Sequence, residues 1–121
     1  MATVKIEFDD RQLRKGISKF NRDLDRNIDM IVDRNALYAT GWLKTNAPWT
    51  DRTGAARSGL TAIPLNKGHI HEIFMSYSVY YGIWLEVANS GKYAILIPGL
   101  RVIGNKLMRD LDGLIDRMNN T

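Results

Sequence analysis

The stretch LRKGISKFNRDLDRNIDMIVDRNALYATGW, residues 13–42, carries the strongest secondary-structure signal in this chain. No Pro or Gly interrupts it between Ile17 and Thr40, and Asp9 and Asp10 are suitable N-cap residues. We expect a helix from about Asp10 to Thr45, roughly 50 Å long at 1.5 Å per residue. That length exceeds the needs of one small domain, so the helix either packs partly on another subunit or bends back as two helices. Its apolar positions recur at helical spacing: Leu13, Ile17, Phe20, Leu24, Ile28, Ile31, Tyr38 and Trp42.

Strands of a small sheet are predicted both before and after this helix in the sequence. The N-terminal run TVKIEF alternates apolar and polar residues, as in a half-buried strand. Two β-prone runs, LTAIPL (60–65) and HIHEIFMSY (69–77), are separated by three residues that suit a hairpin with Gly68 in the left-handed conformation. Pro64 cannot donate to a strand ladder, which places the first of these strands at the edge of the sheet.

The C-terminal part alternates helical and extended patterns. VYYGIWLEVANSG predicts a short amphipathic helix closed by Gly91, and YAILIPG predicts a buried strand or extended segment stopped by Pro98. From Gly99 onward the helical spacing returns and predicts a closing helix to about Asn119. Before the hairpin, Pro48 ends the long helix, and the polar and small residues after it predict a mobile loop over about 48–59.

These elements predict a single α+β domain over residues 1–121. In it, a long N-terminal amphipathic helix and a C-terminal helix pack on a small, mainly antiparallel sheet with a β-hairpin. A composition of 45% hydrophobic and 25% charged residues is typical of globular proteins. No apolar run reaches the roughly 18 residues that span a bilayer, and the start lacks a signal-peptide pattern, so we expect the protein to act where it is synthesised. The absence of Cys excludes disulfides, thiolate zinc sites and cysteine nucleophiles.

The net charge of +4 raises the question of nucleic-acid binding. Basic residues exceed acidic ones slightly in every part of the chain, without a basic cluster or a DNA-binding motif. A spread positive charge favours solubility and tolerates nearby phosphates without strong binding.

Several residues are candidates for catalysis or metal binding. His69 and His71 are separated by one residue on a predicted strand and would share a face, but the adjacent Glu72 would point to the other face, so an exposed polar hairpin surface is favoured over a metal site. Ser58 lies outside a nucleophile elbow, and the DRTGAARSG loop lacks the ending of a phosphate-binding loop. We expect no catalytic, cofactor or metal site, and therefore no enzyme.

Aromatic residues gather in a later segment, beside one carboxylate, Glu86. A general acid would need a second titratable group, and none lies near Glu86 in sequence. Tyr and Trp are enriched in cores and subunit interfaces, which favours packing over base stacking. The candidates for an assembly interface are Trp42, Tyr80, Tyr81, Trp84, Leu85, Glu86 and Tyr93.

Two stretches taken together resemble a family of small tail-completion, or head-tail joining (neck), proteins of long-tailed bacteriophages. The first, after a long amphipathic helix, has Ala-Pro followed by Asp-Arg-Thr-Gly and then Arg-Ser; the second has Tyr-Tyr-Gly, then Leu-Glu and a small-residue turn. The insertion of Trp49 and Thr50 before Asp51 departs from the pattern of relatives. The matching positions are Ala47, Pro48, Asp51, Arg52, Thr53, Gly54, Arg57, Ser58, Tyr80, Tyr81, Gly82, Leu85, Glu86 and Gly91.

The resemblance implies a structural protein of the virion, assembled in the host cytoplasm and placed at the head-tail junction. Proteins of this kind complete the top of the tail as a homo-oligomeric ring, hexameric in the virion, next to the tail terminator and the head-closure ring. Double-stranded DNA passes through the lumen without sequence-specific binding. We expect Glu86 to pair with a cation such as Arg57 or Lys92, and the loop residues Trp49, Arg52 and Arg57 to contact a neighbouring ring or DNA.

Three alternatives remain open at this stage. A tail terminator or other neck-ring protein would share the size and composition of this chain. A small nucleic-acid-binding module would show salt-dependent affinity for free duplex. A small metalloenzyme would use His69, His71 and Glu72.

Overall fold

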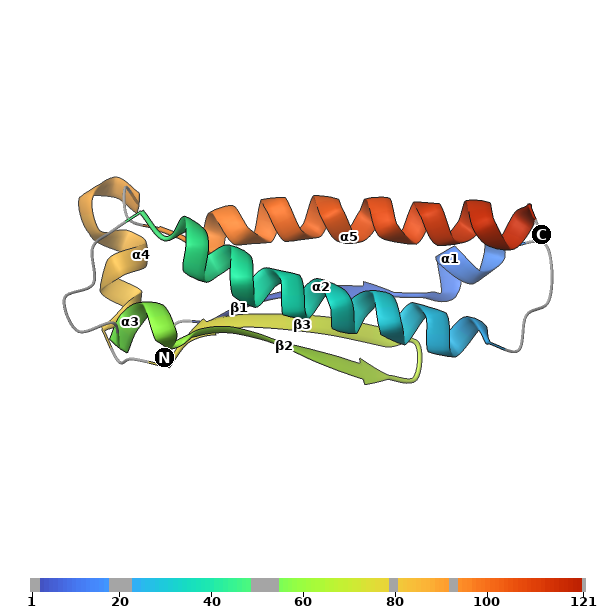
Figure 1. Cartoon of the computed structure of the whole chain (residues 1–121), viewed down its shortest axis with the longest axis horizontal. Helices are drawn as coiled ribbons and strands as arrows, with labels where there is room; N and C mark the ends of the chain where they lie inside the picture. Colours follow the sequence, from blue (N-terminus) through green and yellow to red (C-terminus); the bar gives the residue numbers. More distant parts are fainter. Residues whose placement is uncertain (1–2, 18–22, 49–54, 79–80, 92–93, 121) are drawn as a thin grey trace.

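A computed structural model describes residues 3–17, 23–48, 55–78, 81–91 and 94–120, except for the side chains of 55–56 and 88–90. Two long helices, α2 and α5, run along one face of a three-stranded antiparallel sheet (Figure 1). The predicted α+β class, with helices on a small antiparallel sheet, is confirmed. None of the helices in these ranges combines the length and the apolar character that a membrane crossing requires.

The sheet consists of β1 (Thr3–Asp9), β2 (Leu60–Lys67) and β3 (Ile70–Tyr77), in the order β1-β3-β2. The predicted first strand and hairpin are confirmed. Gly68 in the hairpin turn has a φ of 61°, a conformation that glycine adopts without steric cost. Pro64 lies on β2, an edge strand, as its missing N–H requires.

The N-terminal helical stretch forms two helices, α1 (Arg11–Lys15) and α2 (Leu24–Asn46). The prediction of one continuous helix from Asp10 to Thr45 is wrong, because α1 ends at Lys15, with Gly16 as its C-cap, and Ile17 lies outside any helix. Glycine is a poor helix former, and the Gly16 carbonyl accepts a hydrogen bond from the Asn119 side chain at 2.8 Å. The alternative of two helices therefore holds within the described residues.

The residues that α2 buries match only part of the apolar positions predicted from the sequence. Ile28 and Ile31 are buried as expected, whereas Tyr38 is 46% exposed. Toward its C-terminal end α2 buries smaller side chains instead, together with one polar residue, Asn35. The residues of α2 that face the core are Ile28, Ile31, Val32, Asn35, Ala36, Ala39 and Leu43.

The remaining helices are α3 (Ala55–Ser58), α4 (Gly82–Gly91) and α5 (Leu96–Asn119). The short helix closed by Gly91 is confirmed, with Gly91 at a φ of 82°. The strand predicted over YAILIPG is wrong, since Pro98 lies in the first turn of α5, where a missing N–H breaks no intrahelical bond. The predicted loop over 48–59 contains α3, and its residues 49–54 lie outside the described ranges.

The core lies between the two long helices and the sheet. α5 buries the apolar positions predicted from the sequence, from Ile103 to Met118. On β3 every second side chain is buried, so His71, Ile73, Met75 and Tyr77 face the helices. The opposite face of the sheet carries no helix in the described part of the chain (Figure 1).

Candidate functional site

The α4 end of the molecule holds most of the residues predicted for an interface. α4 follows β3 and precedes α5, and it lies at the same end of the elongated molecule as α3 (Figure 1). Three of its apolar side chains point into solvent, with exposed fractions of 48% for Ile83, 66% for Trp84 and 56% for Val87. Ile97, in the first turn of α5, is 55% exposed. We call Ile83, Trp84, Val87 and Ile97 the α4 surface.

Glu86 holds α4 against the start of α5. Its Oε1 accepts hydrogen bonds from the backbone N–H groups of Ile95 and Leu96, each at 2.8 Å, and from the Tyr77 hydroxyl at 3.0 Å. The N-cap residue of α5, Ile95, supplies no side-chain hydrogen bond of its own. Glu86 therefore caps α5 from a neighbouring helix, and its negative charge lies at the positive end of the α5 dipole.

The expected pairing of Glu86 with Arg57 is wrong. Arg57 Nη1 donates to the carbonyl of Lys44, and Nη2 donates to the carbonyl of Ala47 at 3.2 Å. These carbonyls lie at the C-terminal end of α2, which a cation stabilises. Lys92, the other proposed partner, lies outside the described residues.

Gly82 sets how closely α4 approaches the sheet. A Cβ atom at this position would lie 2.4 Å from Cγ of Tyr77, whose side chain is fully buried. Only glycine allows this contact, because real Cβ atoms do not come so close to a ring. Gly82 and Glu86 both act through Tyr77, so the end of β3 positions α4.

The other predicted interface residues are distributed as follows. Leu85 and Trp42 are partly buried and pack against the core, and Tyr81 is also partly buried. Trp42 borders a shallow hollow on α2 together with Leu37 and Tyr38. The predictions for Trp49, Arg52, Tyr80 and Tyr93 lie outside the described residues.

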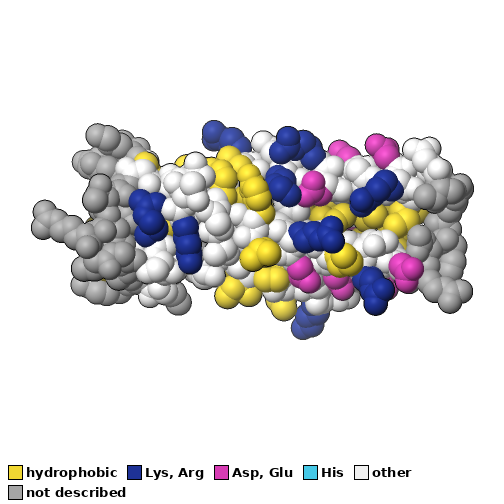
Figure 2. Space-filling view, in the orientation of Figure 1, with side chains coloured by type: hydrophobic (Ala, Val, Ile, Leu, Met, Phe, Trp, Pro, Cys, Tyr) yellow, Lys and Arg dark blue, Asp and Glu magenta, His cyan; other side chains and the backbone are white. Residues whose placement is uncertain are grey.

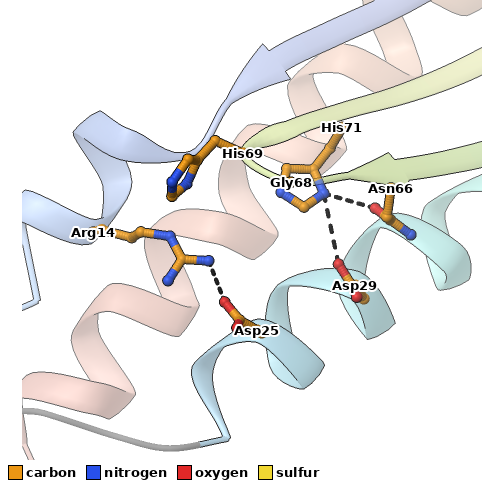
Figure 3. A pocket seen from close by; sticks show the side chains of 7 residues that line it. All are labelled: Arg14, Asp25, Asp29, Asn66, Gly68, His69 and His71. Carbon is orange, nitrogen blue, oxygen red and sulfur yellow. Dashed lines mark hydrogen bonds and ion pairs between the residues drawn. The ribbon is translucent and has the colours of Figure 1, made fainter.

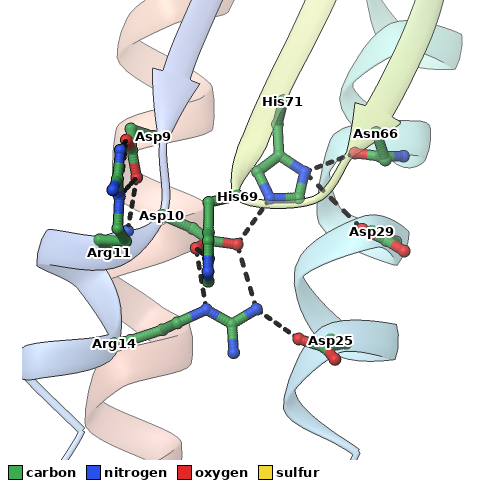
Figure 4. Close-up of polar contacts among 9 residues, drawn as sticks. All are labelled: Asp9, Asp10, Arg11, Arg14, Asp25, Asp29, Asn66, His69 and His71. Carbon is green, nitrogen blue, oxygen red and sulfur yellow. Dashed lines mark hydrogen bonds and ion pairs between the residues drawn. The ribbon is translucent and has the colours of Figure 1, made fainter.

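A second polar site occupies the opposite end of the molecule, where the hairpin turn meets α1 and α2 (Figure 4). Asp10 is fully buried, and each of its carboxylate oxygens has two partners. Oδ1 contacts Arg14 Nε and His69 Nδ1, both at 2.8 Å; Oδ2 contacts His71 Nε2 at 2.7 Å and Arg14 Nη2 at 3.1 Å. We call this group the Asp10 cluster.

The pKa of Asp10 reflects two opposing effects. Burial by itself would raise the pKa, because it disfavours the charged form. The hydrogen bonds from Arg14, His71 and His69 outweigh burial and hold the pKa of Asp10 well below its usual range. Asp10 is therefore a permanent anion near neutral pH, compensated by the groups around it.

His71 is buried, with 2% of its side chain exposed, so the expectation of an exposed polar hairpin surface is wrong for this residue. Its Nδ1 lies 2.7 Å from Asn66 Oδ1, and its ring stacks on Phe8 with centroids 4.9 Å apart. The prediction that both histidines share a face is confirmed by their common partner, Asp10. Glu72 lies on the other face of the sheet, where it accepts a hydrogen bond from Lys5 at 3.2 Å.

A pocket of about 360 Å³ opens beside this cluster, lined by Arg14, Asp25, Asp29, Asn66, Gly68, His69 and His71 (Figure 3). These lining residues include a half-exposed imidazole, His69, but no hydroxyl or thiol nucleophile. No group of three or more His, Asp or Glu among the described residues is placed to hold a metal ion. The contacts instead tie β1, α1, the hairpin and α2 together, which is a structural role.

The sequence did not point to the Asp10 cluster as a unit. Its members come from positions 10, 14, 69 and 71, and only the two histidines are close enough in sequence to suggest a common site. Asp10 is the N-cap residue of α1, as predicted, but its side chain makes no cap hydrogen bond and contacts the cluster instead. An acidic residue at the end of a strand, four residues before an Arg, was the available signal.

Comparison with known proteins does not add to this picture. No family model matches the sequence, and neither the curated proteins nor the solved structures include a significant match.

Proposed function

We propose that this chain is a structural protein of a long-tailed bacteriophage, which completes the top of the tail and joins it to the head. In this role it forms part of a ring around the channel through which DNA passes. The proposal combines the sequence resemblance with one observation on the structure, the exposed apolar α4 surface.

The α4 surface suits a protein interface. Trp84 is the most exposed of its four apolar side chains, at 66%, and Trp is among the residues that contribute most to binding energy at interfaces. An isolated exposed apolar residue is ordinary, whereas several on one short helix and the adjoining turn favour contact with another protein. The segment that carries them is also the one that resembles the neck family.

The contacts that hold α4 in place also favour a binding role. Glu86 and Gly82 fix the helix through hydrogen bonds and close packing on Tyr77. An interface presented on a fixed element loses less conformational entropy on binding than one on a flexible loop. A closed ring needs contacts between two different patches of adjacent copies, so the α4 surface would meet a different patch on the next subunit.

Electron microscopy of lysates from a phage that lacks this gene tests the proposal. We expect filled heads to accumulate beside separate, unjoined tails. Intact, infectious particles without this protein would overturn the neck role.

A pair of variants tests the part played by the α4 surface. Trp84→Ser should reduce the yield of joined particles in a complementation assay, while the Tm of the purified chain stays close to that of the wild type. The matched control is Ile63→Thr on β2, which removes a side chain of similar exposure, 56%, from another surface. Equal yields from the two variants would show that the α4 surface does not carry the contact.

A further inference from the structure

A groove between α2 and α5 is lined by an unusual number of cations. Two adjoining hollows, of about 500 and 250 Å³, share Ile31, Arg34 and Arg117 and so form one continuous depression. Lys106 and Arg109 also border it, with Asp110 as its one lining carboxylate in the described chain. Figure 2 shows Lys and Arg side chains beside exposed hydrophobic patches on this side of the molecule, with some acidic residues among them.

Asp110 forms a salt bridge with Lys106 and lies near a second cation of the groove, Arg109, without a salt bridge to it. It accepts hydrogen bonds from Lys106 Nζ at 2.8 Å and from the buried Asn35 side chain at 2.9 Å. The Lys106 ammonium also lies 4.9 Å from the centre of the Tyr38 ring. Burial alone would raise the pKa of Asp110, but the bonds from Lys106 and Asn35 lower it, so Asp110 stays charged near neutral pH.

The three arginines of the groove are less fully neutralised than Lys106. Arg34, Arg109 and Arg117 are exposed, and none forms a salt bridge with any residue in the described ranges. Their guanidinium groups therefore remain available for an external anion. A planar guanidinium binds a carboxylate through two parallel hydrogen bonds.

The floor of the groove is apolar. Ile31, Leu114 and Met118 are nearly buried, and Met30 is 39% exposed at the rim. Gly113 lies on its wall, and a Cβ atom there would meet nothing within 4 Å, so packing within the chain does not require glycine at this position. A bare stretch of helix backbone beside an apolar floor leaves room for side chains of a partner.

We propose that this groove binds an acidic, amphipathic segment of a different protein, with apolar side chains on the floor and carboxylates at Arg34, Arg109 and Arg117. An apolar floor favours such a segment over a nucleic-acid backbone, which offers phosphates but few apolar groups. The inference does not depend on the neck role, because it rests only on the charges and shape of the groove.

A second copy of the chain offers little unpaired negative charge for the groove. Within the described residues, every carboxylate other than Asp112 and Asp116 already has a polar or charged partner. Those two lie on α5 but do not line the groove. An acidic segment of a different protein therefore complements the three arginines better than a second copy does.

Fluorescence anisotropy with a labelled synthetic peptide tests the proposal on the full chain. The probe is a 20-residue helical peptide with Leu at helical spacing and Glu elsewhere. We expect saturable binding that weakens at least tenfold in Arg109→Glu. Arg101→Glu, on the same helix but outside the groove, makes the same charge change and should bind within twofold of the wild type.

Two glycine substitutions distinguish an effect on peptide binding in the groove from an effect on folding. Gly113→Gln should weaken peptide binding at least fivefold while the Tm stays equal or rises, since Gln is a better helix former than Gly. Gly104→Gln, at a position that also has open space around its Cβ, should change the Tm similarly and leave binding intact.

Three results would overturn the proposal. The first is equal binding by Arg109→Glu and Arg101→Glu. The second is equal affinity for a control peptide in which Ser replaces every Leu, which would mean simple charge attraction. The third is tighter binding of a 20-base-pair duplex than of the peptide, which would identify the groove as a nucleic-acid surface.

Discussion

Asp10 and Glu86 organise opposite ends of the molecule, and the groups that surround them differ in kind. Asp10 is fully buried and is met by one guanidinium and two imidazoles. Glu86 is partly exposed and is met by backbone N–H groups and a tyrosine hydroxyl. A buried carboxylate needs charged partners to offset lost hydration, whereas one at a helix N-terminus is stabilised by aligned dipoles.

This difference shows how a lone carboxylate in an apolar segment can serve the fold. Asp10 contacts side chains of α1 and the hairpin, and its partners Arg14 and His71 also contact Asp25 and Asp29 of α2, so its effect extends over the hairpin end. Glu86 connects α4 to the first turn of α5, so its effect is confined to the α4 end. Neither residue is free to act as a general acid, because its oxygens are occupied by contacts within the chain.

The largest effect is expected from Asp10→Asn. The amide cannot accept from four donors, and its NH₂ group would face a guanidinium or an imidazole, so the free energy of unfolding should fall by about 3 kcal/mol. Urea denaturation measures the change. Asp9→Asn is the neighbouring control, since Asp9 is more exposed and pairs with the largely exposed Arg11. An equal loss in the two variants would contradict a special role for the buried carboxylate.

Gly82→Ala should be almost as damaging at the other end. The added methyl group would overlap the buried Tyr77 ring, and we expect a loss of about 2–3 kcal/mol in the free energy of unfolding. Gly41→Ala on α2 is the matched control, because a Cβ there meets nothing within 4 Å. That control should stabilise the chain by about 0.5–1 kcal/mol. A tolerated Gly82→Ala would mean that α4 is not held tightly on the sheet.

Glu86→Ala should cost about 2 kcal/mol, and Glu86→Gln about 1 kcal/mol. Glutamine keeps an acceptor oxygen but loses the charge at the helix N-terminus. Amide hydrogen exchange should show faster exchange at Ile95 and Leu96, with little change around Asp10. Protection that stays the same at those two amides would rule out the capping role.

Acid should weaken the hairpin end in particular. Because the pKa of Asp10 is lower in the folded chain than its ordinary value of 3.8, its stabilising contribution is complete above that value. The contribution is lost as the pH falls below about 4 toward the folded-state pKa. The free energy of unfolding of Asp10→Asn should therefore depend less steeply on pH between about 4 and 2 than that of the wild type. Parallel pH curves would contradict this assignment.

Local patterns predicted much of the fold. Alternation in TVKIEF, the turn at Gly68 and the helical spacing after Gly99 each depend on neighbours within a few residues, and the structure confirms them. Two predictions failed at single residues. Gly16 ends a helix within an apolar pattern that was taken as continuous, and Pro98 lies in the first turn of a helix where a stop was expected.

The contacts at the candidate sites were harder to predict from the sequence than the fold was. Glu86 and Gly82 were singled out, but their common partner Tyr77 was not, because the contact depends on how α4 turns back onto β3. Arg57 was expected to contact a partner, whereas it caps α2 through the carbonyls of Lys44 and Ala47. Its contact with a neighbouring ring or DNA stays a prediction, as does the interface role of Trp84.

By itself, the sequence determined the α+β class, the hairpin and the apolar side of α5, because these follow from periodicity and turn chemistry within short segments. Only the tertiary structure decided which carboxylates are buried, which cations meet them and which arginines remain unpaired in the groove. Such pairings join residues far apart in the chain, as Asp10 and His71 show, and their free energies depend on burial. Burial is a property of the assembled layers, and no local pattern encodes it.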